Sequence, residues 1–116
     1  MNRKVAIFAF RGEATCFVHA LLNVLDLSEK GYDACLVIEG SATTQIGELA
    51  ESRNQLASLY AKVRERGLIR GVCRACASKM GTLEAAKAQK LRICEELSGH
   101  PSFEKYLAQG YEIITI

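Results

Sequence analysis

The sequence lacks several features that would assign it to a non-globular or membrane class. Its 116 residues contain a single proline, and 49% of them are apolar, which excludes a disordered or fibrous chain. No apolar run approaches the roughly 20 residues that span a bilayer. Fifteen Lys and Arg against thirteen Asp and Glu leave a net charge of only +2, which does not favour nucleic-acid binding. We expect one soluble domain over residues 1–116 that binds neither membrane nor nucleic acid.

A complete signal peptide and a fully paired disulfide framework are also missing. The basic start at Arg3 and Lys4 leads into an apolar run, but Arg11 and Glu13 interrupt it before the core of a signal peptide is complete. The five cysteines are an odd number, which argues against a secreted protein with all its cysteines paired. These patterns predict a cytoplasmic location.

Apolar segments of strand and helix type alternate along the chain. The patterns predict strands at 4–10, 32–38, 68–72 and 111–116, and helices at 14–30, 46–66, 82–97 and 101–109, the second with a break near Arg53 and Asn54. Short apolar strands of this kind fit a parallel sheet covered by helices. The predicted fold class is α/β, a three-layer α/β/α domain of the flavodoxin/Rossmann-like type with a mostly parallel sheet of about four or five strands.

The expected strand order is 2-1-3-4, which reverses between the first and third strands. Open α/β sheets form sites beyond the carboxyl ends of the strands at such a reversal. The loops 11–16 and 73–81 would meet there.

The strongest candidate for chemistry is the C-x-x-C pair of Cys73 and Cys76, which directly follows the third predicted strand. A helix beginning there would favour the thiolate, and Arg70, Arg74 and Lys79 could act in the same direction. A thiolate is the nucleophile of disulfide exchange and of attack on sulfane sulfur. The alternative is that both cysteines are small packed residues beside a solvated basic loop.

The other cysteines and the histidines carry weaker signals. Cys16, in the first turn of a helix, is a weaker catalytic candidate that could face the Cys73 loop or simply be packed. We expect Cys35 and Cys94 in the core, the latter on a helix. His19 is expected on a solvated helix face, and His100 as a cap or loop residue before Pro101. No second pair of ligands has metal-site spacing, so no metal site is predicted, with Cys16, Cys73 and Cys76 as the alternative ligand set.

Phosphate-binding motifs are absent, since no G-x-G-x-x-G follows the first strand and no P-loop occurs. The candidates for binding an anionic group of a substrate are Gly12, Gly40 and Ser41, although loops of this composition commonly serve as helix caps. Glu39, at the end of the second predicted strand, is expected to face solvent.

The segment Gly71-Val72-Cys73-Arg74-Ala75-Cys76-Ala77-Ser78-Lys79-Met80-Gly81 resembles the DsrE/DsrF-like family of small sulfur-handling proteins. Cys73 and Gly81 match the cysteine and glycine of that family's pattern, and some members also carry the second cysteine, here Cys76. The closing segment 110–115 looks like the family's last strand, so that the resemblance covers nearly the whole chain.

The resemblance implies a three-layer domain that often forms trimers or hexamers and carries a persulfide on the matched cysteine. It therefore predicts a sulfur carrier or sulfurtransferase-like protein with Cys73 as the carrier, Cys76 assisting or resolving, a sulfur donor or acceptor protein as partner, and no cofactor.

Two other functions stay open. One is a dithiol redox protein, although the C-x-x-C follows a late strand and Pro101 lies at a helix start, unlike the thioredoxin arrangement. The other is a non-enzymatic, oligomeric small-ligand-binding subunit whose cysteines are packing residues. A dimer is possible as well as a trimer or hexamer.

Overall fold

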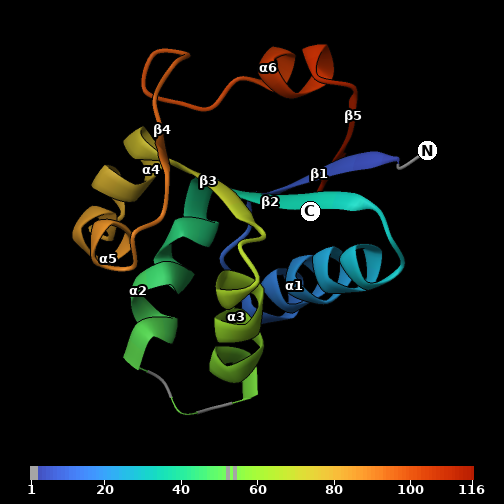
Figure 1. Cartoon of the computed structure of the whole chain (residues 1–116). Coiled ribbons are helices and arrows are strands. Elements are labelled where there is room, and N and C mark those ends of the chain that lie inside the picture. The colour runs from blue at the N-terminus through green and yellow to red at the C-terminus, as the bar shows by residue number, and fades with distance from the viewer. Residues whose placement is uncertain (1–2, 52, 54) are drawn as a thin grey trace.

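The computed structural model describes residues 3–51, 53 and 55–116 and contains a five-stranded parallel sheet (Figure 1). The strand order is β4-β3-β2-β1-β5. The strands are β1 (Lys4–Ala9), β2 (Asp33–Ile38), β3 (Ile69–Cys73), β4 (Ile93–Cys94) and β5 (Tyr111–Thr115). The helices are α1 (Ala14–Glu29), α2 (Thr44–Glu51), α3 (Gln55–Glu65), α4 (Arg74–Lys79), α5 (Leu83–Ala88) and α6 (Phe103–Ala108), with a 3₁₀ turn η1 at Gly40–Thr43.

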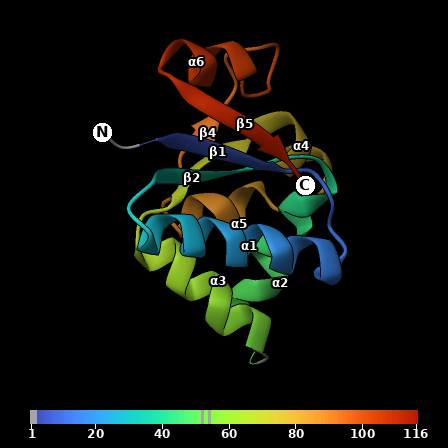
Figure 2. The same ribbon diagram turned by 90° about the vertical axis from the view of Figure 1, so that its right-hand side faces the viewer.

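Alternate residues of the strands supply two separate cores, because successive strand side chains point to opposite faces of a sheet. Val5, Ile7 and Ala9 of β1 belong to the larger core, formed with α1, α2 and α3. Ala6 and Phe8 belong to the smaller one, on the face covered by α6. Figure 2 shows α6 on one side of the sheet and α1, α2 and α3 on the other. The predicted α/β class with helices on both faces of a five-stranded parallel sheet is confirmed.

The predicted strand order 2-1-3-4 is wrong. β3 pairs with β2, and β1 lies between β2 and β5. The chain steps in one direction through β1, β2, β3 and β4, since consecutive strands usually become neighbours. It then returns to place β5 on the far side of β1. Because β2 lies between β1 and β3, the segment that follows β2 separates the loops 11–16 and 73–81.

The predicted helix over 82–97 is also wrong beyond its first turns. Helix α5 ends at Ala88, Lys90 has a positive φ of 62°, and the chain then forms the short edge strand β4. Apolar residues at 91 and 94 fit a helical period and a short strand equally well, so that periodicity alone could not decide between them. The predicted break near Arg53 and Asn54 is confirmed by the end of α2 at Glu51 and the start of α3 at Gln55, although Asn54 itself lies outside the described residues.

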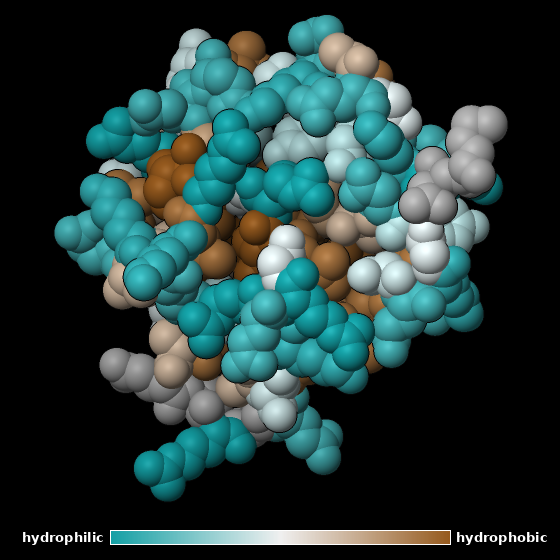
Figure 3. All heavy atoms as spheres, viewed as in Figure 1, coloured by the Kyte–Doolittle hydropathy of each residue, from teal (hydrophilic) through white to brown (hydrophobic). Residues whose placement is uncertain are grey.

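None of the helices formed by the described residues combines the length and the apolar composition that a bilayer crossing requires. On the face shown in Figure 3, apolar side chains form a band across the middle, and hydrophilic side chains lie above and below it. Among the residues that the structure describes, the large apolar side chains exposed at the surface are those of Leu22, Met80, Leu97, Phe103, Leu107 and Ile114.

Candidate functional site

Cys73 is the last residue of β3 and the N-cap of α4. Its extended backbone (φ −65°, ψ 118°) turns the chain from strand into helix, and its Sγ accepts a hydrogen bond from the backbone N–H of Cys76 at 3.4 Å. The residue is fully buried, whereas Cys76, in the first turn of α4, is half-buried. The two thiols of the motif therefore differ in access: only Cys76 meets solvent.

His100 joins this pair, which the sequence did not predict. Its Nδ1 lies 3.1 Å from the Sγ of Cys73 and 3.9 Å from the Sγ of Cys76. An imidazole nitrogen at these distances can accept a proton from a thiol or donate one to a thiolate, depending on its tautomer.

A tight turn over Leu97–His100 brings the imidazole to the thiols. Ser98 and Gly99 both have positive φ (49° and 92°), and Leu97 and His100 exchange backbone hydrogen bonds of 2.8 and 2.9 Å. These values describe a type I′ turn, in which glycine is preferred. The turn is attached to α4, because the N–H of Ala75 donates to the carbonyl of Gly99 at 2.9 Å.

Glu39 completes the group from the end of β2. The prediction that it faces solvent is wrong: it is only 7% exposed, and burial raises the pKa of its carboxyl to about 7. It is buried because β3 rather than solvent lies beside the end of β2. One donor atom from each of Glu39, Cys73, Cys76 and His100 lies within 4.8 Å of the other three, and we call these four residues the thiol cluster.

The expected activation of Cys73 by positive charge is not present in this arrangement. Burial raises the pKa of the Cys73 thiol to about 12, and the Cys76 N–H lowers it by less. The nearby arginines are engaged elsewhere: Arg70 bonds Tyr111 and pairs with Asp33, and the exposed Arg74 pairs with Glu95 at 2.6 Å. Formation of the Cys73 thiolate therefore depends more on a proton acceptor beside the thiol, such as His100, than on the N-terminus of α4.

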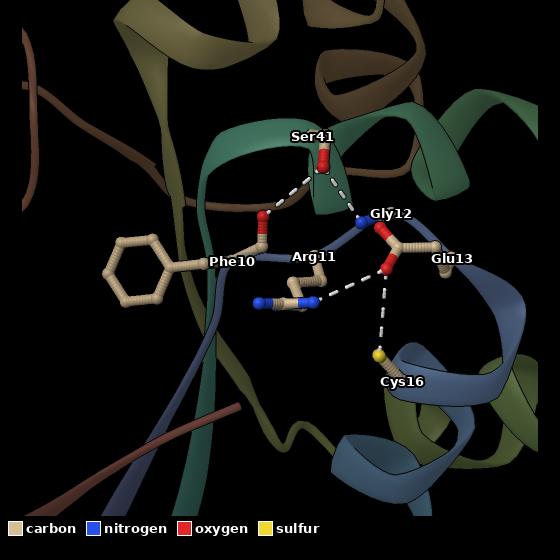
Figure 4. Close-up of polar contacts among 6 residues, drawn as sticks. All are labelled: Phe10, Arg11, Gly12, Glu13, Cys16 and Ser41. Atoms are coloured by element: carbon tan, nitrogen blue, oxygen red, sulfur yellow. Dashed lines mark hydrogen bonds and ion pairs between the residues drawn. The ribbon is translucent and has the colours of Figure 1, made fainter.

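Cys16 lies outside the thiol cluster. Its Sγ is 3.9 Å from a carboxylate oxygen of Glu13, which also pairs with Arg11 (Figure 4). Because β2 separates β1 from β3, the loop that carries Cys16 does not adjoin the Cys73 loop. The expected meeting of the two loops is therefore wrong.

Gly12, Gly40 and Ser41 lie together, and their polar groups bind the two loops to each other. The Gly12 N–H donates to the Ser41 Oγ at 2.8 Å, and that hydroxyl is 3.3 Å from the Phe10 carbonyl (Figure 4). A Cβ on Gly12 would be 2.5 Å from the Ser41 carbonyl oxygen, so glycine permits this close approach. The Gly12 N–H already donates to the Ser41 hydroxyl and is therefore not free for an anion. Anion binding by these three residues stays a prediction.

Cys35 and Cys94 are buried in strands β2 and β4, as expected for core residues, although Cys94 lies on a strand and not on a helix. His19 is exposed on α1, as predicted.

A relative shares most of this chain. The uncharacterized protein MJ0733 of Methanocaldococcus jannaschii is 36% identical over 99 residues, which cover 85% of this chain and 78% of that protein. The chain belongs to the family of MJ0733. An uncharacterized protein of Archaeoglobus fulgidus is 49% identical over 43 residues, which cover 37% of this chain and 70% of that protein. No family model matches the sequence.

A solved structure shares the fold of this chain. The conserved protein of unknown function BT1422 from Bacteroides thetaiotaomicron superimposes with a TM-score of 0.71, over 97% of this chain and 94% of that one. At 15% identity the likeness shows a common three-layer fold.

Proposed function

We propose that the protein is a cysteine-based sulfur carrier that loads sulfur on the Cys73–Cys76 pair. The observation that carries the proposal is the contact of two free thiols with one imidazole nitrogen at the carboxyl end of β3. The resemblance of segment 71–81 to the DsrE/DsrF-like family supports the same function.

Sulfur enters at Cys76, the thiol that a donor can reach. His100 accepts its proton, and the thiolate attacks the outer sulfur of a donor persulfide, R–S–SH. A sulfur–sulfur bond to Cys76 forms, the donor's sulfur–sulfur bond breaks, and the proton passes to the departing donor thiolate. The products are the Cys76 persulfide and R–SH.

Cys73, the carrier expected from sequence, then holds the sulfur out of solvent. Its sulfur lies within 4.8 Å of that of Cys76, so that its thiolate can attack the outer sulfur of the Cys76 persulfide. His100, whose Nδ1 lies 3.1 Å from the Cys73 Sγ, accepts the Cys73 proton. The bond between the Cys76 sulfur and its outer sulfur breaks, and the proton passes to the departing Cys76 thiolate, which leaves the persulfide on Cys73 and a thiol on Cys76. The reverse steps return the sulfur to an acceptor thiol on a partner protein.

Intact-mass spectrometry after exposure to an inorganic polysulfide tests the proposal. Wild type should gain one sulfur atom that survives a brief wash with a small thiol. Cys76→Ser should slow the gain, and Cys73→Ser should gain sulfur that the wash removes. Cys16→Ser, which changes a half-buried cysteine in the first turn of another helix, is the matched control and should behave as wild type. No adduct on wild type, or equal loss in the control, would contradict the proposal.

Dithiol redox chemistry is the second candidate, favoured by the proximity of the two sulfur atoms. Two electrons and two protons would pass from Cys73 and Cys76 to a disulfide oxidant, which would become two thiols. The same mass spectra separate the two functions, because a disulfide appears as the loss of two hydrogens instead of the gain of sulfur.

We also propose that copies of the chain associate. Phe103, Leu107 and Ile114 of α6 and β5 expose 44%, 57% and 46% of their surface, and β5 is an edge strand. Sedimentation velocity should show a dimer or larger assembly that Ile114→Lys dissociates. A monomer at all concentrations would contradict this part of the proposal.

A further inference from the structure

We infer that the thiol cluster binds one zinc ion through Glu39, Cys73, Cys76 and His100, and that bound zinc prevents sulfur loading. The second half of this inference rests on the proposed function, whereas zinc binding itself does not.

The distances in the cluster suit a tetrahedral ion. With Zn–S near 2.3 Å and Zn–N near 2.05 Å, tetrahedral zinc holds sulfur and nitrogen donors about 3.6 Å apart. The Nδ1 of His100 lies 3.1 and 3.9 Å from the two sulfur atoms, on either side of that value. All four donor atoms lie within 4.8 Å of one another, so shifts of under about 1 Å would complete the coordination shell.

The types of donor select the metal. Two thiolates and an imidazole are ligands that favour zinc, while magnesium and calcium favour sites made of oxygen. A carboxylate is an accepted fourth ligand of zinc. Each bound thiol releases its proton to solvent, so that loading one zinc ion frees two thiol protons.

The backbone around the cluster positions the ligands independently of any ion. Cys73 and Cys76 share the strand-to-helix turn at the start of α4, and the N–H of Cys76 donates to the Sγ of Cys73. The turn at Ser98 and Gly99 fixes His100, and its carbonyl contact with Ala75 joins it to the same helix. Groups that orient ligands in this way raise metal affinity. Cys76 and His100 are the ligands through which the ion would enter from solvent, because Glu39 and Cys73 are buried.

Zinc and sulfur would compete for the same sulfur atoms. An ion with four protein ligands leaves no open position for a substrate, and both thiolates then bond to the metal. Zinc would therefore protect the thiols until an acceptor of zinc or a chelator removes it.

Metal titration of the full chain tests the inference. Reduced protein stripped with a chelator and supplied with Zn²⁺ alone should bind one equivalent with an apparent Kd below about 1 μM. Co²⁺ alone should give the visible absorption of a tetrahedral thiolate complex. Cys76→Ser and His100→Ala should each weaken zinc binding by at least about a hundredfold, since the loss of groups that only orient ligands already costs 10- to 100-fold.

Cys16→Ser and His19→Ala are the matched controls, because they remove the same residue types from α1. Less than a tenth of an equivalent of zinc on wild type, or equal weakening by the controls, would overturn the inference. Glu39→Gln should change the cobalt spectrum; an unchanged spectrum would remove Glu39 from the ligand set and overturn the four-ligand site.

Sulfur loading is measured separately, with chelator and then with one equivalent of zinc. Zinc should reduce the sulfur adduct on Cys73 and Cys76 at least about tenfold. Zinc binding without any sulfur adduct in the chelated protein would refute the sulfur carrier and leave the metal site standing. Equal loading with and without zinc would refute the competition.

Discussion

The two cysteines of one C-x-x-C motif have different environments three residues apart. Cys73 ends a buried strand, and its Sγ lies among the N–H of Cys76, His100 and the carbonyl of Gly99. Cys76, one helical turn later, keeps a path to solvent. A motif in sequence indicates that both thiols belong to one site, but which of them reacts first is decided by burial.

Alkylation should separate the cysteines in the metal-free protein. At pH 8, iodoacetamide should modify Cys76 at least about tenfold faster than Cys73, because a buried thiol is shielded and the raised pKa of Cys73 keeps it protonated. Cys35, with its pKa raised to about 11 by burial, should resist as well until the protein unfolds. Peptide mass spectrometry over time measures the rates. Equal rates for Cys73 and Cys76 would show that the thiol of Cys73 is open to solvent.

Glu39 should make stability depend on pH in the metal-free protein. Its folded pKa of about 7 lies above the unfolded value of 4.5, so the native state binds the proton more tightly. Its contribution is complete below pH 4.5 and is lost as the pH rises through 7. Glu39→Gln removes this dependence. The free energy of unfolding of the variant minus that of wild type should therefore be larger at pH 8 than at pH 4.5, by up to about 3 kcal/mol.

Urea unfolding at pH 4.5, 6, 7 and 8 measures that difference. Glu84→Gln, at an exposed side chain on α5, serves as the control and should follow wild type at every pH. A Glu39→Gln difference that stays constant across the pH range would contradict the assignment of a buried, protonated carboxyl.

At the scale of elements, the turn over Leu97–His100 places the His100 imidazole beside the two thiols. Gly99→Ala should destabilise the protein by about 1–2 kcal/mol, since its φ of 92° is unfavourable for a residue with a Cβ. The added Cβ would also lie 3.2 Å from that of Ala75 and push the turn away from α4. Zinc affinity should fall by about tenfold or more.

Gly31→Ala is the control for backbone strain. Gly31 has the same φ of 92°, but a Cβ there meets nothing within 4 Å. It should lower stability by a similar amount and leave zinc affinity unchanged. If both variants bind zinc alike, the turn does not position His100.

The fold could be predicted further than the site. β1, α1, β2 and β5 are predicted within a residue or two, since each is a clear apolar pattern bounded by turn residues. Cys73 and Cys76 are found because their spacing is local. His100 and Glu39 are not, because their approach depends on β3 lying beside β2 and on the path of the chain after β4. The Ser98-Gly99 pair before His100 does indicate a tight turn, but nothing in the spacing ties residue 100 to residue 73.

For the whole molecule, the main asymmetry is in how the two sheet faces are covered. One face is covered by α1, α2 and α3, which have 16, 8 and 11 residues, while the other depends on the six residues of α6. Phe8 connects α6 to the sheet, with edge-to-face contacts to Phe103 at 4.8 Å and Tyr106 at 5.3 Å between ring centres.

Phe8→Ala should therefore cost about 3–5 kcal/mol of unfolding free energy, the range for a fully buried aromatic residue. Phe103→Ala, which removes a partner ring that is 44% exposed, should cost less than half as much. Denaturant unfolding of both variants measures the difference. Equal costs would show that the face under α6 does not behave as a core.

The pairing of β5 with β1 sets the order in which the molecule can be completed. Tyr111 pairs with Lys4 across nearly the whole chain, so this strand closes after the others during synthesis from the N-terminus. Both thiols of the cluster leave the ribosome before the turn that carries His100. A nascent chain thus presents Cys73 and Cys76 without their imidazole, and the finished site arises only after His100 has also left the ribosome.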